Sequence, residues 1–102
     1  MGYQVLITKP AQTDLDEIFY WYDEQKDALG FLFLSEFDKI IANIKYNPFF
    51  ASIYEENVRI ASLKRFPYYV VYRILTETCQ CRVIAIIHQH RNPKLIHARS
   101  GY

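Results

Sequence analysis

The amino-acid sequence predicts an α+β fold of order β-α-α-β-β-β, in which a helical hairpin packs on a small antiparallel sheet. Apolar residues recur at helical spacing through the first half of the chain. The second half changes to short runs rich in β-branched and aromatic residues. Few residues separate the two helical stretches, so they are expected to pack antiparallel. At 102 residues, with no repeat or linker, we expect one domain over residues 1–102.

The elements are predicted in chain order from these patterns. Residues 3–8 form an opening strand, and a first helix begins after the N-cap residue Thr8, with Pro10 just inside it. Its apolar stripe comprises Ala11, Leu15, Ile18, Phe19 and Tyr22. This helix should stop before Gly30. The stripe of a second helix, over residues 31–46, comprises Phe33, Phe37, Ile40 and Ile44, and Asn47-Pro48 ends it.

Three strands are expected in the second half, over residues 58–63, 68–75 and 82–88. Pro67 suits the start of the second of them, because proline enters sheets at strand starts and edges. Turn-forming residues 76–80 join the last two strands in a hairpin. A short tail follows Pro93.

Charge is divided between the two halves of the chain. Residues 1–57 hold four cations and ten anions, a net −6, whereas residues 58–102 hold eight cations and one anion, a net +7. The total of +1 therefore conceals a polarised surface. Such a surface points to an acidic partner.

Several classes of protein are disfavoured. No apolar run reaches the ~18 residues of a membrane span, and no signal peptide is evident, so no membrane association is expected. Cys79 and Cys81 lie two apart, where a mutual disulfide would be strained, which fits a reducing cytoplasm. His88 and His90 lack a third ligand at zinc spacing, so neither a metal nor a cofactor is expected.

The basic residues of the second half are interleaved with aromatic ones. This pattern suits phosphate and base binding, but it equally suits the protection of strand edges by Lys and Arg. A histidine here could act as a general base or only form hydrogen bonds. Phe49, Phe50 and other rings outside the apolar stripes either form a surface for a protein partner or fold over the core.

Several ordered motifs resemble the RelE/ParE toxin superfamily, from about Val5 to Arg99. They are the Asp-Leu-Asp-Glu-Ile start of the first helix, Asn47-Pro48, Val58-Arg59, residues 64–68 (Lys-Arg-Phe-Pro-Tyr), 71–73 (Val-Tyr-Arg) and 87–93 (Ile-His-Gln-His-Arg-Asn-Pro), and Arg99. The resemblance implies the toxin of a type II toxin–antitoxin, or plasmid-stabilisation, system. A cognate antitoxin protein would neutralise it within a hetero-oligomer.

The ParE-like branch of this superfamily is the better match, through Phe66-Pro67-Tyr68, Tyr72 and the stretch before Pro93. That branch is associated with binding DNA gyrase, without chemistry of its own. RelE-like members are ribosome-dependent mRNA endonucleases that use a set of cations. The positions resembling their two catalytic lysines hold Ile60 and Ser62 here, and Tyr69 replaces an arginine.

The resemblance and the charge division together give the candidate residues. The candidate binding residues are Arg59, Lys64, Arg65, Tyr72, Arg73, Arg91 and Arg99. For the alternative, a metal-independent RelE-like endoribonuclease acting on mRNA at the ribosome, the candidate catalytic residues are Arg91, His88, His97 and Lys64. A third hypothesis is a non-toxic relative that acts as a binding module.

Overall fold

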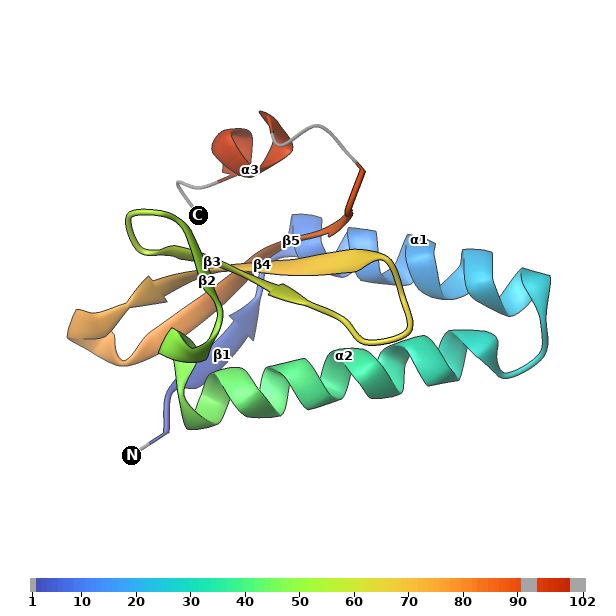
Figure 1. Ribbon diagram of the computed structural model, residues 1–102, viewed down its shortest axis with the longest axis horizontal. Helices are drawn as coiled ribbons and strands as arrows, with labels where there is room; N and C mark the ends of the chain where they lie inside the picture. The colour runs from blue at the N-terminus through green and yellow to red at the C-terminus, as the bar shows by residue number, and fades with distance from the viewer. Residues whose placement is uncertain (1, 91–93, 100–102) are drawn as a thin grey trace.

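The computed structural model describes residues 2–90 and 94–99, and it has three layers (Figure 1). A five-stranded sheet lies between a hairpin of two long helices on one face and one short helix on the other. The elements are β1 (Gln4–Ile7), α1 (Lys9–Gln25), α2 (Leu29–Tyr46), η1 (Pro48–Phe50), β2 (Ser52–Glu55), β3 (Val58–Ser62), β4 (Tyr68–Leu75), η2 (Thr76–Thr78), β5 (Gln80–His88) and α3 (Lys94–Arg99). The α+β class and the predicted helical hairpin on a sheet are confirmed.

The sheet has the strand order β1-β5-β4-β3-β2 and is mixed. β1 pairs with β5 in parallel, from Gln4 opposite Gln80 to Ile7 opposite Val83, whereas every other pairing is antiparallel. The expectation of a purely antiparallel sheet is therefore wrong at this edge. The helical hairpin lies between β1 and the later strands, and this long connection allows β1 to enter beside β5 in the same direction.

The two helix stripes bury most of the residues that their spacing predicted, whereas Phe19 and Tyr22 are only partly buried. Thr8 caps α1, because its side-chain oxygen accepts a hydrogen bond from the amide of Ala11 at 3.4 Å. Ala11, Leu15 and Ile18 of α1 and Phe33, Phe37, Ile40 and Ile44 of α2 are buried against the sheet. Local periodicity thus determined which face of each helix packs inward.

The helix–helix turn differs from its prediction. α1 ends at Gln25, and the left-handed residue is Ala28, with a φ of 69°. Gly30 lies inside α2 and is buried. A Cβ atom at that position would lie 2.8 Å from the backbone oxygen of Phe19, so glycine permits the close approach of the helices and does not cap α1.

An edge strand and a third helix were not expected. Residues 52–55 form the edge strand β2, and residues 94–99 form α3 where a tail was predicted. Cys79 also lies outside the strands, in a turn where its backbone is left-handed, so the two cysteines do not share a strand face. Cys79 is exposed, Cys81 is buried, and both are free thiols.

The inner strand β5 is covered on both faces. Its residues from Cys81 to Ile87 are buried except for Arg82, because the helical hairpin covers one side and α3 covers part of the other. An irregularity between Val71 and Tyr72 on β4 shifts the register, so that Ile84 and Ala85 both pack in the apolar cluster on the α3 side. This double coverage explains why β5 is a continuous apolar run in the sequence.

Candidate functional site

Exposed cations gather in the loop between β3 and β4. Lys64 and Arg65 are both exposed there. Arg65 adopts a φ of 72°, in the left-handed region that is costly for a residue with a Cβ atom. Because strained backbone is found preferentially at functional sites, Arg65 remains a candidate contact residue.

Two further arginines lie side by side on the sheet. Arg73 of β4 is directly opposite Arg82 of β5, and both are partly exposed. They line a surface depression of about 370 Å³ together with Glu77 and neighbouring polar residues of the β4–β5 connection. Guanidinium groups are donors suited to carboxylates, so this depression is a candidate position for an acidic side chain of a partner.

Arg59 is held inside the fold and is poorly placed as a contact residue. Its Nη1 atom donates to the backbone oxygens of Phe49 and Ala51, at 3.0 and 2.9 Å. Its guanidinium also lies 5.4 Å from the centre of the Phe49 ring. These bonds hold the segment around η1 against the sheet, which gives Arg59 a structural role in this conformation.

Tyr72 has the same role from the neighbouring strand. It is directly opposite Arg59 in the β3–β4 pairing, and its side chain is fully buried. Its hydroxyl donates to the backbone oxygen of Pro48 at 2.5 Å, and burial raises the pKa of this phenol above its ordinary value. Tyr72 was predicted as a binding residue, and in this structure no part of its side chain reaches solvent.

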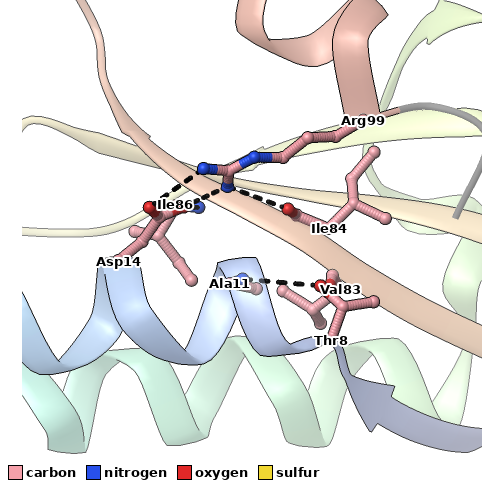
Figure 2. A network of polar contacts seen from close by, with 7 residues as sticks. All are labelled: Thr8, Ala11, Asp14, Val83, Ile84, Ile86 and Arg99. Carbon is pink, nitrogen blue, oxygen red and sulfur yellow. Dashed lines mark hydrogen bonds and ion pairs between the residues drawn. The ribbon is translucent and has the colours of Figure 1, made fainter.

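Arg99 fastens α3 to α1 across the end of β1 (Figure 2). Its Nη1 atom lies 2.6 Å from Oδ2 of Asp14 and donates to the backbone oxygen of Ile84 at 3.1 Å. The same Asp14 oxygen accepts from the amide of Ile86 at 3.0 Å. β1 ends opposite Val83, so this ion pair takes over hydrogen bonds that a longer β1 would have made to β5.

Both side chains of this ion pair are only 17% exposed. Arg99 is thus another predicted contact residue whose guanidinium is used inside the fold. Arg91 lies outside the described residues.

An acid–base cluster forms where α3 meets β2. Nε2 of His97 lies 3.1 Å from the hydroxyl of Tyr54, and Nδ1 lies 3.4 Å from Oε2 of Glu55. In the tautomer protonated on Nδ1, the imidazole donates to Glu55 and accepts from Tyr54. A carboxylate that orients an imidazole toward a hydroxyl is an arrangement suited to proton transfer.

Sequence reasoning identified His97 but missed Tyr54 and Glu55, because β2 was not predicted. The other catalytic candidates lie elsewhere. His88, at the end of β5, has its ring 5.2 Å from that of Tyr68 and accepts a hydrogen bond from the amide of His90 at 3.2 Å. Lys64 lies in the β3–β4 loop.

The positions that resemble the lysines and arginine of RelE-like nucleases do lie together. Ser62 and Tyr69 are directly opposite each other in the β3–β4 pairing. Ile60 and Tyr69 pack against the apolar cluster on the α3 side of the sheet. This face therefore carries an apolar residue, a hydroxyl and a phenol where a nuclease of that type would concentrate positive charge.

Large apolar side chains are also left at the surface near η1. Phe49 is 46% exposed, Phe50 is 44% exposed and Ile53 of β2 is 68% exposed. The segment around η1 therefore anchors itself through the buried Pro48 and Ala51 rather than through its two phenylalanines. Of the two interpretations of these rings, exposure at a surface is the one that the structure supports.

Neither a membrane span nor a metal centre is found in the parts of the chain that the structure describes. Across residues 2–90 and 94–99, no helix combines the length and hydropathy needed to cross a bilayer. Within the same ranges, no group of three or more His, Cys, Asp or Glu side chains is arranged to hold a metal ion.

Comparison with known proteins places this geometry in a family. The model of the family described as ParE toxin of type II toxin-antitoxin system, parDE, matches residues 5–93. Among curated proteins, none matches the sequence.

Solved structures with a similar fold include a chain of the chromosomal ParDE system from P. aeruginosa, with a TM-score of 0.72 and 15% identity over 85% of this chain and 96% of that one. A free mutant of the E. coli toxin RelE has a TM-score of 0.66 and 12% identity, over 99% of this chain and 97% of that one. A chain of the RelBE2 toxin–antitoxin complex from Mycobacterium tuberculosis has a TM-score of 0.56 and 18% identity, over 86% of this chain and 99% of that one. At these identities the structural likeness establishes the fold alone.

Proposed function

The chain belongs to the ParE toxin family of type II toxin–antitoxin systems, and on that premise we propose how it acts. It binds a cellular target of the DNA gyrase type without catalysing a reaction, and a cognate antitoxin neutralises it in a hetero-oligomer. The proposal includes a cytoplasmic location and a role in plasmid stabilisation or its chromosomal equivalent. The observation that carries it is the absence of cationic side chains at positions 60, 62 and 69 on the described sheet, within a family of toxins.

The antitoxin is proposed to present an acidic segment to the basic side of the sheet. Arg73 and Arg82 are directly opposite each other there, and Lys64 and Arg65 add positive charge in the β3–β4 loop at the other end of these strands. A segment that is disordered when free can fold onto such a surface, with carboxylates pairing with arginines and apolar side chains covering exposed rings. Complexes of a toxin with its antitoxin, as in RelBE2, support the existence of such a partner.

The experiment is co-purification of the tagged chain with the product of the adjacent reading frame. The variants Arg73→Glu and Arg65→Glu should weaken the complex, because each reverses a charge on the proposed contact surface. Lys45→Glu makes the same change at an exposed residue of α2 and should leave the complex intact. Equal effects of all three variants would contradict the proposed antitoxin surface. Failure of the unmodified chain to bind would contradict the proposal that this protein is its antitoxin.

The mode of action is tested by inducing the chain without its antitoxin. Gyrase poisoning predicts DNA damage and filamentation while transcripts stay intact. Cuts in messenger RNA that follow the reading frame would contradict it. Normal growth would instead support a non-toxic relative that only binds.

One observation favours a second candidate function, a metal-independent endoribonuclease. His97, held between Tyr54 and Glu55, could accept a proton from a ribose 2′-hydroxyl. His97→Asn should then abolish transcript cleavage in induced cells, and Glu55→Gln should reduce it. If induced cells show no cleavage with the unmodified chain, this candidate is excluded.

A further inference from the structure

A groove runs between α1 and the end of β5, and it reaches Pro67 in the loop between β3 and β4. Its α1 wall is formed by Asp14, Glu17, Ile18 and Trp21, and its sheet wall by Tyr68, Ile86, Ile87 and His88, around about 280 Å³. A second hollow of about 480 Å³ shares Trp21, Tyr68 and His88 with the first and continues past Pro67. We call the two hollows together the Trp21 groove.

The Trp21 groove combines open aromatic surface with negative charge. Trp21 is 55% exposed although it lies beside an apolar floor, and its ring touches that of Tyr22 edge-on at 5.2 Å. Glu17 is exposed one helical turn from Trp21 and lines the same hollow. Asp16 and Glu24 are further exposed carboxylates of α1, although neither lines the groove.

This chemistry fits the side chain of an arginine or a lysine. Faces of Trp and Tyr attract a cation, most strongly when a carboxylate lies beside them. Asp14 is already paired with Arg99, so Glu17 is the exposed carboxylate of the α1 wall that a bound cation would meet. An acidic segment would be repelled by Glu17, and a purely apolar segment would leave that carboxylate partly desolvated.

We propose that the Trp21 groove is a docking site for a basic segment of the target protein, with an Arg or Lys side chain inserted between Trp21 and Glu17. This inference rests on the proposed function in assuming a protein target. It assigns that target to a hollow other than the one lined by Arg73 and Arg82, which are proposed to bind the antitoxin. The acidic helical layer and the basic sheet then serve two partners of opposite charge.

A direct binding measurement tests the site. The chain contains a single tryptophan, so Trp21 fluorescence reports on this groove alone. The probe is a short synthetic peptide of alternating glycine and arginine, and the comparison peptide has glutamate in place of arginine. The arginine peptide should change the fluorescence in a saturable way, and the glutamate peptide should not.

Matched variants separate insertion into the groove from general attraction to an acidic protein. Glu17→Lys should weaken binding of the labelled arginine peptide about tenfold, and Trp21→Ala by a similar factor. Asp38→Lys makes the same charge change at an exposed residue of α2 and should have much less effect. Glu17→Gln removes the charge with little change of shape, so it keeps the test valid if the lysine variant folds poorly.

Equal weakening by Glu17→Lys and Asp38→Lys would overturn the groove, as would tighter binding of the glutamate peptide. Co-purification with the antitoxin is measured in parallel and should be unchanged by Glu17→Gln. Failure of the unmodified chain to bind the antitoxin would contradict the proposed function. The peptide titration would still show whether the groove binds arginine. The two failures are therefore distinguishable.

Discussion

The ion pair between Arg99 and Asp14 should contribute more to stability than an ordinary surface pair. Substituting Arg99 by Met keeps the aliphatic stem but removes the guanidinium. The change deletes the bond to Asp14 at 2.6 Å and the bond to the backbone oxygen of Ile84 at 3.1 Å. Of the bonds to Asp14 drawn in Figure 2, only the one from the amide of Ile86 then remains.

The magnitude follows from this geometry. Breaking a fully buried pair costs about 3–5 kcal/mol, whereas exposed pairs contribute about 0–1 kcal/mol. With both side chains 17% exposed, we expect a loss of about 2 kcal/mol in the free energy of unfolding.

Urea denaturation of four proteins measures the effect: the unmodified chain, Arg99→Met, Asp14→Asn and the double variant. The coupling energy from this cycle should be about 1–2 kcal/mol, because each single change removes the charged contact. The control Lys45→Met removes an exposed cation of α2 and should leave the unfolding curve nearly unchanged. A coupling energy below about 0.5 kcal/mol would refute the reasoning that this pair replaces missing strand hydrogen bonds.

Three further predictions concern stability. Tyr72→Phe should lower the free energy of unfolding by about 1–2 kcal/mol, because it leaves the Pro48 oxygen without its buried donor. Urea denaturation measures this loss, and an unchanged unfolding curve would mean that water replaces the hydroxyl. Gly30→Ala should lower the free energy of unfolding by about 1–3 kcal/mol, because the added Cβ would lie 2.8 Å from Phe19. A thermal unfolding midpoint that is unchanged or higher would contradict this contact. Burial raises the pKa of Cys81 from 9.0 to about 11, so the unfolded chain loses this proton at lower pH than the folded chain. Stability present in full below pH 9 should therefore fall as the pH rises toward about 11, and Cys81→Ala should reduce that fall in unfolding measured across this range.

The main elements could be predicted because they depend on neighbours in the sequence. Thr8 and Pro10 start α1 by local capping, and the apolar spacing of α1 and α2 selects their buried faces. β2 escaped prediction because residues 52–55 have a mostly exposed edge position and no clear alternation. The parallel pairing of β1 was equally hidden, since its partner β5 lies more than 70 residues away.

The candidate site was predicted less well for a physical reason. Residue type marks Arg59, Tyr72 and Arg99 as able to bind a partner, but it does not say where their hydrogen bonds go. In the fold, their donors are directed to Phe49, Ala51, Pro48, Asp14 and Ile84. Lys64 and Arg65 are exposed and Arg73 is partly exposed, and these three residues stay proposed contacts.

The sequence by itself determined the fold class, the helical hairpin, the family resemblance and the division of charge between the two halves. These properties follow from local periodicity, capping and composition, which need no knowledge of the packed chain. The tertiary structure alone decided which charged and aromatic groups are used internally, which groups meet at His97, and that Trp21 borders an acidic groove. These are contacts between residues far apart in the chain, and their free energy depends on burial and distance, neither of which is encoded at a single position.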